Sequence, residues 1–214
     1  MTTQNLVAFW GWTRTEQTYK KLVESAPKDW RVLAISYEDL LPKGDINAFQ
    51  GAVLKFLEDN ALKEVNLVGH SLGGALAIEF AYHHPEKVKR LYLLDSEGVY
   101  GHETIREVIR ILMTHAAPGQ KKMGKENIKA FYRALRKPFW YAKLAHFAHH
   151  AHLYEEASAL RVPTVIIWGE KDDLTPLWQG QKLNEWIPGS RLVVLKDMDH
   201  DWIIHSPELF WENI

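Results

Sequence analysis

Six short apolar stretches recur along this chain, and their pattern limits the fold more than any other feature of the sequence. They are rich in valine, leucine and isoleucine and comprise residues 6–10, 32–36, 65–69, 88–94, 163–168 and 191–195. Each stretch is continuously apolar instead of alternating with polar residues. Because strands of this kind are covered on both faces, the pattern predicts a parallel sheet with helices on either side.

Helical patterns occupy the segments between these stretches. Residues 46–60 repeat apolar side chains at helical spacing, and the segment 72–84 ends before Pro85. Thr175-Pro176 and Ser206-Pro207 each predict the start of a helix, with the hydroxyl residue as N-cap and proline at the first helical position. Strands alternating with helices over 214 residues predict an α/β fold with about six mostly parallel strands in a doubly wound sheet.

Residues 99–160 interrupt this alternation, because they have no strand pattern and contain at least three helical ones. We therefore predict that residues 1–98 and 161–214 form the core and that 99–160 form a helical cap, or lid, at the carboxyl edge of the sheet. The charge of this segment is also distinct. Residues 102–150 hold ten Lys or Arg and three Glu, a net charge of +7, in a chain whose net charge is −1.

The composition argues against several classes of function. A nearly neutral chain has no global attraction to nucleic acid. The absence of cysteine excludes disulfides, thiolate metal sites and a cysteine nucleophile. No apolar stretch approaches the roughly 18 residues that a membrane span requires, and the N-terminal residues lack the pattern of a secretory signal. We therefore expect a cytoplasmic protein with no membrane partner.

The third apolar stretch ends in the sequence Gly69-His70-Ser71-Leu72-Gly73, and an apolar helical pattern follows it. A G-x-S-x-G motif between a strand and a helix is typical of a sharp turn that exposes a nucleophilic serine. The glycines are needed because only small residues fit two positions before and after the serine. The helix then directs its N-terminus toward the developing negative charge. Ser71 is therefore the predicted nucleophile.

A serine nucleophile needs a base, which is itself oriented by an acid. Such partners are expected at the carboxyl ends of later strands. The fifth apolar stretch is followed by Asp172 and Asp173, and the sixth by His200, so His200 is the predicted base. Asp95, at the end of the fourth stretch, is a further candidate acid, although we expect it to accept hydrogen bonds from nearby backbone amides instead.

The motifs GHSLGG, WGEKDDLTP and HSPELFW, with Asp199-His200, resemble those of small α/β-hydrolase carboxylesterases. The chain is most similar to pimeloyl-acyl-carrier-protein methyl ester esterases, over nearly its whole length outside 99–160. The resemblance implies an α/β-hydrolase fold that lacks the two edge strands usually found first, and a chemistry without metal or cofactor. It also implies a catalytic triad of Ser71, Asp172 and His200, because the family's acid lies three positions after the glycine.

The same resemblance implies an oxyanion hole formed by the backbone N–H groups of Leu72 and Trp12. Members of the family usually carry His-Gly at the end of the first strand seen here, whereas this chain has Trp10-Gly11. Indole cannot accept the hydrogen bonds that imidazole accepts. We therefore expect packing to hold this loop in place.

Other side chains follow from this placement of the site. The substrate pocket is expected to be apolar and aromatic, lined by Trp12, His70, Phe139, Trp140, Met198 and Trp202. Three acids surround the base, Asp197, Asp199 and Asp201. We interpret them as solvated, whereas partial burial would make them raise the pKa of His200. The cluster His146, His149, His150 and His152 is interpreted as cap surface or pocket edge instead of a metal site.

The sequence thus predicts a serine hydrolase that cleaves carboxylic esters of short-to-medium acyl chain through an acyl-enzyme. A thioester, a lactone or a C–C bond is an alternative substrate, and a non-catalytic or weakly catalytic binding protein is an alternative function. The basic cap suggests an acidic acyl-carrier protein as partner. Its contacts would be Arg106, Arg110, Lys121, Lys122, Lys125, Lys129, Arg133 and Arg136. The alternative interpretation is that these side chains are the solvated faces of amphipathic helices.

Overall fold

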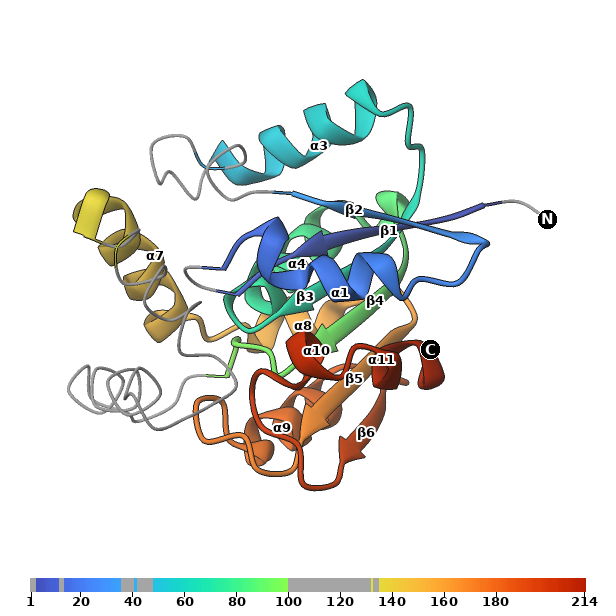
Figure 1. Ribbon diagram of the computed structural model, residues 1–214. Coiled ribbons are helices and arrows are strands. Elements are labelled where there is room, and N and C mark those ends of the chain that lie inside the picture. Colours follow the sequence, from blue (N-terminus) through green and yellow to red (C-terminus); the bar gives the residue numbers. More distant parts are fainter. Residues whose placement is uncertain (1–2, 12–13, 36–40, 42–47, 100–131, 133–134) are drawn as a thin grey trace.

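The computed structural model describes residues 3–11, 14–35, 41, 48–99, 132 and 135–214. Within these residues six parallel strands form one sheet, in the order β2-β1-β3-β4-β5-β6 (Figure 1). The strands are β1 (Gln4–Phe9), β2 (Trp30–Ala34), β3 (Val65–His70), β4 (Val88–Leu94), β5 (Thr164–Gly169) and β6 (Arg191–Leu195). The prediction of six strands is confirmed, and each begins and ends within two residues of its apolar stretch.

The strand order has one point at which the chain changes direction. From β1 the chain adds β2 on one side, and it then returns to add β3 on the other side of β1. All later strands extend the sheet away from β1. In open sheets of this kind, ligands bind at the carboxyl ends of the strands beside such a switch point. The carboxyl ends of β1 and β3 are therefore the expected place for a site.

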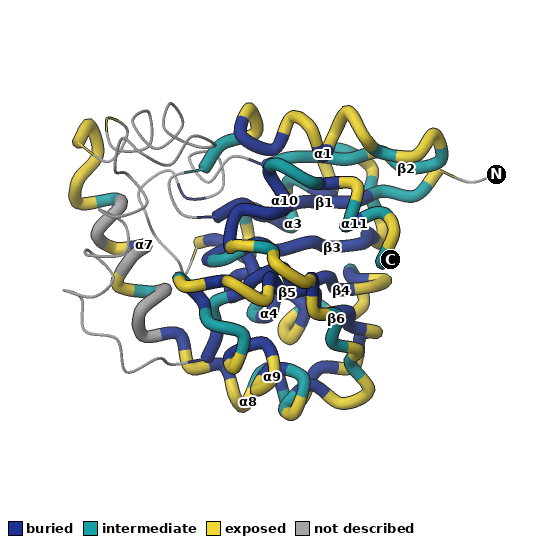
Figure 2. The backbone as a smooth tube through the Cα atoms, turned by 60° about the horizontal axis from the view of Figure 1, so that its bottom comes forward, coloured by how far each residue is buried: buried dark blue, intermediate teal, exposed yellow. Residues whose placement is uncertain are grey.

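Helices cover both faces of the sheet, and the buried strands lie between them (Figures 1 and 2). One apolar cluster joins the sheet to α3 (Phe49–Asp59), α4 (Leu72–His83), α8 (Tyr154–Ala159) and α9 (Leu177–Trp186). The other joins the opposite face to η1 (Glu16–Tyr19), α1 (Lys20–Glu24), α10 (Trp202–His205) and α11 (Glu208–Glu212). A further short helix is η3 (Pro85–Lys87). This two-sided burial explains why the strands are continuously apolar.

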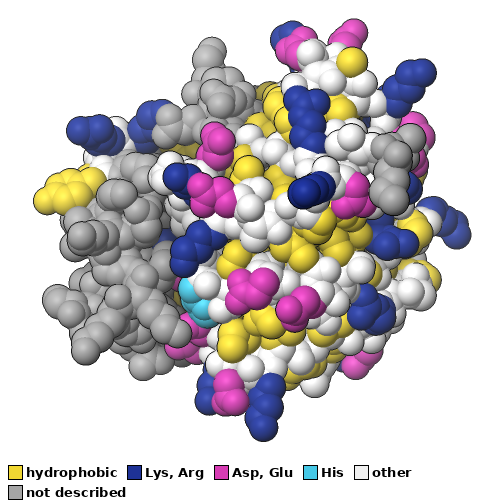
Figure 3. Space-filling model, turned by 45° about the vertical axis from the view of Figure 1, so that its right-hand side comes forward, with side chains coloured by type: hydrophobic (Ala, Val, Ile, Leu, Met, Phe, Trp, Pro, Cys, Tyr) yellow, Lys and Arg dark blue, Asp and Glu magenta, His cyan; other side chains and the backbone are white. Residues whose placement is uncertain are grey.

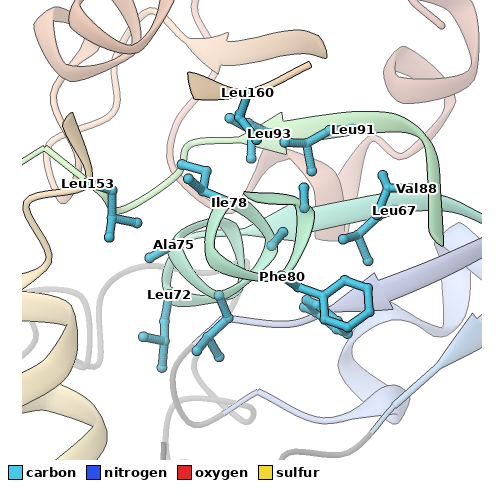
Figure 4. Packing of buried hydrophobic residues seen from close by; sticks show 14 of the residues in the cluster. Leu67, Leu72, Ala75, Ile78, Phe80, Val88, Leu91, Leu93, Leu153 and Leu160 are labelled. Atoms are coloured by element: carbon cyan, nitrogen blue, oxygen red, sulfur yellow. The ribbon is translucent and has the colours of Figure 1, made fainter. Parts of the chain in front are cut away.

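The helix after the serine motif has more buried residues than any other described helix that covers the sheet. Nine of its twelve residues are buried, because it packs against the sheet on one side and against other helices on the other. Figure 4 shows its side chains among residues of β3 and β4 and of the segment 153–160; the labelled residues are Leu67, Leu72, Ala75, Ile78, Phe80, Val88, Leu91, Leu93, Leu153 and Leu160. Such burial fixes the N-terminus of α4 relative to the sheet.

Two predicted helix starts differ by one residue from those observed. Helix α9 begins at Leu177 after an extended Pro176, and α11 begins at Glu208 after Pro207. Thr175 is therefore not the N-cap of α9. Its side chain is buried, and its hydroxyl turns toward Asp172 at the edge of the sheet. Contacts with the Asp172 carboxylate and the Asp95 carbonyl have replaced the capping interaction that the sequence suggested.

The predicted cap lies mostly outside the described residues, since 100–131 and 133–134 are among those not described. Its described part is helical, with α7 (Pro138–His150) beside the carboxyl edge of the sheet (Figure 1). The Trp140 indole N–H donates to the Leu41 carbonyl over 2.7 Å and so joins α7 to the segment after β2. Helix α8, also within 99–160, packs against α4 and α9 of the core. A covering role for the remainder stays a prediction.

Acidic and basic side chains are interspersed over the part of the surface that Figure 3 shows in colour, with no extended area of one sign. In the part of the chain that the structure describes, no helix combines the length and the apolar character that crossing a membrane requires.

Candidate active site

Ser71 is the single residue between β3 and α4, since the strand ends at His70 and the helix begins at Leu72. Its backbone angles are φ 56° and ψ −125°. A positive φ is unusual for a residue with a side chain and is retained where the surrounding structure enforces it. Here the Ser71 amide donates to the Leu94 carbonyl over 3.0 Å, and its carbonyl accepts from Gly74 and Glu97. The strained turn is therefore held from three directions.

The glycines of the motif are required by close backbone contacts. A Cβ at Gly69 would lie 2.4 Å from the Gly73 carbonyl oxygen, and one at Gly73 would lie 2.2 Å from the Phe9 carbonyl oxygen. Both distances are far below van der Waals contact, and the opposing atoms are backbone atoms that cannot move aside. This packing brings the start of α4 against the end of β1. The amide of Leu72, as the first helical residue, has no partner within the helix and is available as a donor.

The loop after β1 lies directly against the serine. A Cβ at Gly11 would lie 3.4 Å from Ser71 Cβ and 3.3 Å from His70 Nδ1. Gly11 therefore permits a close approach that a larger residue would obstruct. Trp12, the expected second oxyanion donor, lies outside the described residues. Trp10 is 1% exposed and stacks on Tyr19, with ring centroids 3.9 Å apart. As expected from the sequence, packing supports this loop.

Asp172 and His200, from the loops after β5 and β6, form a buried pair. His200 Nδ1 lies 2.7 Å from Asp172 Oδ2, and both side chains are almost completely enclosed. The other carboxylate oxygen, Oδ1, accepts the amides of Leu174 and Thr175 at 2.8 and 2.9 Å, and the Thr175 hydroxyl lies 2.7 Å from Oδ2. These contacts fix the carboxylate so that His200 carries its proton on Nδ1 and leaves Nε2 to accept one. Asp173 is exposed.

The charges at this pair favour an ionised acid and a basic histidine. Burial opposes the imidazolium, but the carboxylate of Asp172 outweighs this effect, and Asp95 and Asp201 add to it, so the pKa of His200 rises to about 10. Burial likewise opposes ionisation of Asp172, but His200 and the hydrogen bonds from Thr175 lower the pKa of that carboxyl overall. Only the neutral form of His200, with Nε2 unprotonated, can take a proton from a serine hydroxyl, so we expect activity to rise with pH as His200 loses its proton.

Asp95 is fully buried beneath the pair and has a different set of partners. Its Oδ1 accepts the Gly169 amide over 2.8 Å, and its Oδ2 accepts the indole N–H of Trp202. Burial is the main effect that raises the pKa of Asp95, and the neighbouring Asp172 carboxylate raises it further. Asp95 therefore joins β4, β5 and α10, whereas His200 Nδ1 donates its hydrogen bond to Asp172. The expected role of Asp95 as an acceptor for a backbone amide agrees with this geometry.

The three acids around the base occupy different environments. Asp197 and Asp199 are exposed and pair with Lys171 and His205. Asp201 instead is 8% exposed, and both of its carboxylate oxygens bond to one guanidinium nitrogen of Arg14, at 3.1 and 2.9 Å. The interpretation of all three as solvated therefore fails for Asp201. Arg14 follows β1, so this ion pair joins the loop after β1 to the segment that carries the base.

His70, expected as a pocket residue, is instead enclosed by polar partners. Its Nε2 lies 2.9 Å from the His200 carbonyl oxygen, and its Nδ1 lies 2.5 Å from the Tyr19 hydroxyl. A carbonyl only accepts, so Nε2 carries the hydrogen and Nδ1 accepts from Tyr19. Burial, with a further contribution from His200, lowers the pKa of His70 to about 3. The ring is therefore neutral at physiological pH.

This lowered pKa predicts a steep loss of stability in acid. The unfolded chain binds a proton at His70 below about pH 6.5, whereas the folded chain does not, so stability is present above pH ~6.5 and is lost as pH falls toward 3. The slope from one such proton is about 1.4 kcal/mol per pH unit. Replacing His70→Gln should reduce the slope of unfolding free energy by that amount between about pH 4 and 6. Urea unfolding at several pH values measures it, and equal slopes would contradict the buried neutral ring.

The remaining predicted pocket residues have no common environment. Trp202 is fully buried in the core and donates to Asp95, so it supports the site from beneath instead of forming an accessible wall. Phe139 is 85% exposed, and Trp140 and Met198 are partly buried. Among the described residues, no three His, Asp or Glu side chains converge as metal ligands do.

Sequence reasoning missed three polar residues that organise this edge of the sheet: Arg14, Tyr19 and Thr175. Thr175 could have been found, because a hydroxyl residue three positions after an aspartate often closes a local turn around the carboxylate. Arg14 and Tyr19 carried no comparable signal, since their partners lie 187 and 51 positions away.

Known proteins share this sequence pattern and this fold. A model of the Alpha/beta hydrolase family matches residues 8–212. The uncharacterized hydrolase YugF of Bacillus subtilis is 24% identical over 99% of this chain and 88% of its own length. A pimeloyl-[acyl-carrier protein] methyl ester esterase of Neisseria meningitidis is 24% identical over 94% of this chain and 88% of its own.

The enol-lactonase of Burkholderia xenovorans has a similar structure, with a TM-score of 0.81 and 21% identity over 99% of this chain and 90% of that one. The family match spans nearly all of the chain. The serine turn follows β3, where the strand order predicts a site, and the Asp–His pair follows β5 and β6 at the same carboxyl edge of the sheet. The chain therefore belongs to the alpha/beta hydrolase family.

Proposed function

We propose that this protein is a serine carboxylesterase whose catalytic residues are Ser71, His200 and Asp172. The observation that carries this proposal is the buried 2.7 Å hydrogen bond between Asp172 and His200, located at the same edge of the sheet as the strained Ser71 turn. A hydroxyl is activated by a base that a buried carboxylate orients, and these residue types in this arrangement supply both.

In the proposed reaction, His200 Nε2 takes the proton from Ser71 Oγ as that oxygen attacks the ester carbonyl. The resulting tetrahedral oxyanion accepts hydrogen bonds from the amide of Leu72 and, by family resemblance, from that of Trp12. His200 then gives the proton to the departing alcohol, and an acyl-Ser71 ester remains. Water, deprotonated by His200, attacks this ester, and His200 then returns the proton to Ser71 Oγ as the acid is released. Asp172 stabilises the imidazolium in both halves.

Esters of short-to-medium acyl chain are the proposed substrates. Two similar proteins act, by their names, on a methyl ester and on an enol-lactone. Both reactions release an alcohol or enol oxygen from an acyl carbon, which is the chemistry that an activated serine performs. We also propose that the protein is cytoplasmic.

Labelling with a fluorophosphonate and a panel of p-nitrophenyl esters would test this function. We expect one phosphonate per chain on Ser71, located by peptide mass, and turnover that is highest for acetyl to octanoyl esters. Labelling without turnover of any ester, thioester or lactone would contradict the esterase and favour a non-catalytic or weakly catalytic protein that binds a small molecule. Preferred turnover of a thioester, a lactone or a C–C substrate would change the assigned bond while retaining the mechanism.

We further propose that the basic segment 102–150 contacts an acidic acyl-carrier protein. Its net charge of +7 is opposite in sign to the −8 of the remaining residues, which follows from a total of −1. Arg136 is exposed, and the other seven predicted contact residues, Arg106, Arg110, Lys121, Lys122, Lys125, Lys129 and Arg133, lie outside the described residues. Complementary charge mainly accelerates association, and salt screens it.

This contact predicts a salt-dependent preference. On a carrier-bound methyl ester, kcat/KM should fall at least about tenfold between roughly 20 mM and 500 mM salt, because the attraction is screened. On the methyl ester of the same free acid it should change little, which makes that substrate the matched control. Equal salt dependence for the two esters would contradict a carrier-protein contact.

A further inference from the structure

The loop after β1 and the segment that carries the base are joined by a continuous chain of buried hydrogen bonds. It begins at the Gly11 amide, passes through Tyr19 and His70, and ends at the carbonyl of His200. We propose that Tyr19 is a positioning residue that keeps the oxyanion-hole loop and the catalytic base in a fixed position relative to each other. This inference rests on the proposed esterase function.

The direction of each bond follows from the atoms involved. The Gly11 amide can only donate, and it lies 3.2 Å from the Tyr19 hydroxyl oxygen. The His200 carbonyl can only accept, so His70 Nε2 carries its hydrogen there and His70 Nδ1 is an acceptor. The Tyr19 hydroxyl therefore accepts from Gly11 and donates to His70 over 2.5 Å. Each polar atom in this series of hydrogen bonds is therefore defined as a donor or as an acceptor.

Burial makes this arrangement stable and specific. Tyr19 is 1% exposed and His70 is 2% exposed. Burial raises the pKa of Tyr19 and lowers that of His70, so the phenol stays protonated and the imidazole stays neutral. Trp10 stacks on Tyr19 at an angle of 15° between the ring planes. The ring is thus clamped while its hydroxyl spans the two partners.

A second link joins the same two segments. The Arg14 amide donates to the Gly11 carbonyl over 3.1 Å, and the Arg14 guanidinium pairs with Asp201, the residue after the base. The turn after β1 is therefore attached to the base segment at Gly11, through Tyr19 and His70, and at Arg14, through Asp201. Two attachments fix the orientation of these two segments relative to each other, whereas a single attachment would allow one to rotate against the other.

The consequence for catalysis is geometric. The residue after Gly11 is the expected oxyanion donor, and His200 must reach the serine in the same step. A small displacement of either group lowers the rate more than it lowers substrate binding. Tyr19 acts through Gly11 and His70, because neither its hydroxyl nor its ring is placed on the reacting atoms.

The substitution Tyr19→Phe removes only the hydroxyl and retains the stack on Trp10. We expect kcat per active site to fall about 10- to 30-fold with KM changed less than about threefold, as for a transition-state effect. Active-site titration with a p-nitrophenyl ester burst counts the folded protein, so a loss of stability would lower the titre instead of kcat per site. Tyr92→Phe is the matched control, because Tyr92 is equally buried in the same apolar cluster and pairs with Phe210 away from the site.

A double-mutant cycle tests whether Tyr19 and His70 act through the same series of hydrogen bonds. If Tyr19 acts through His70, the two substitutions remove the same interaction. The kcat of the double variant Tyr19→Phe with His70→Gln should then be within about threefold of that of the less active single variant. Losses that multiply would overturn the linkage. The ¹⁵N shifts of the His70 ring provide a readout without activity: in the wild type they should report the Nε2–H neutral form from about pH 5 to 9. A charged or Nδ1–H ring would overturn the inference.

Failure of the inference and failure of the function are distinguishable. If the wild type is labelled at Ser71 and hydrolyses esters while Tyr19→Phe matches Tyr92→Phe in kcat per site, the positioning role alone is overturned. If the wild type neither labels nor hydrolyses any acyl substrate, the proposed function is overturned and the positioning role with it.

Discussion

Replacing Ser71→Ala is expected to lower ester turnover by at least about 10⁴-fold while the protein remains folded. The serine Oγ is the atom to which the acyl group is transferred, so its removal leaves only the contribution of the oxyanion hole and of substrate binding. Alanine keeps the Cβ of serine, and the contacts of the Ser71 backbone with Leu94, Gly74 and Glu97 are unaffected. Steady-state turnover of a p-nitrophenyl ester, with circular dichroism as the measure of folding, tests the prediction.

Ser190→Ala provides the control for this variant. Ser190 precedes β6 at the opposite edge of the sheet and bonds to Asn184, so it should retain full activity. If Ser71→Ala kept more than about 1% of the wild-type turnover, another group would have to be the nucleophile, and the proposed mechanism would be wrong.

The second large effect is expected for Asp172→Asn, which should lower kcat by about 10³- to 10⁴-fold. An amide in place of the carboxylate can present its NH₂ group to His200 Nδ1, which then accepts and leaves Nε2 protonated. The base would be held in the wrong tautomer. The loss should also shift the pH dependence: the carboxylate raises the pKa of His200, so its removal lowers that pKa and moves the half-maximal pH of kcat/KM downward.

Asp95→Asn is the matched variant for the acid. The amide oxygen can still accept the Gly169 amide, but its NH₂ group would face the Trp202 indole N–H, and two donors cannot bond. We expect a stability loss of about 1–3 kcal/mol and less than about a tenfold loss of kcat. pH–rate profiles and urea unfolding of both variants separate the two carboxyls. A larger kcat loss in Asp95→Asn than in Asp172→Asn would reverse the assignment of the acid.

Much of the fold was predictable because it depends on local patterns. Continuous apolar stretches mark strands buried on both faces, and the observed strands coincide with them within two residues. The serine turn was predictable for the same reason, since Gly69 and Gly73 are needed wherever backbone segments approach so closely. The helix starts at Pro176 and Pro207 were predicted one residue early. At Pro176 the reason is that the hydroxyl of Thr175 bonds to Asp172 instead of capping the helix.

The polar organisation of the site was less predictable. Asp197, Asp199 and Asp201 look alike in the sequence, yet the last is buried because Arg14 lies opposite it. His70 could be a pocket residue by position, and its neighbours show it to be an internal hydrogen-bonding group. The functions assigned to Trp12, to the cap and to its basic side chains remain predictions.

The sequence by itself determined the sheet, the order of its strands along the chain and the turn that carries Ser71, because periodicity and small residues at fixed spacing act over a few positions. Only the tertiary structure decided which ionisable side chains are buried together. Asp95, Asp172 and His200 follow three different strands, and their pKa values depend on burial and on one another. Hydrogen bonds and charges act over a few ångströms in space, whatever the separation along the chain, and that distance is set by the completed fold.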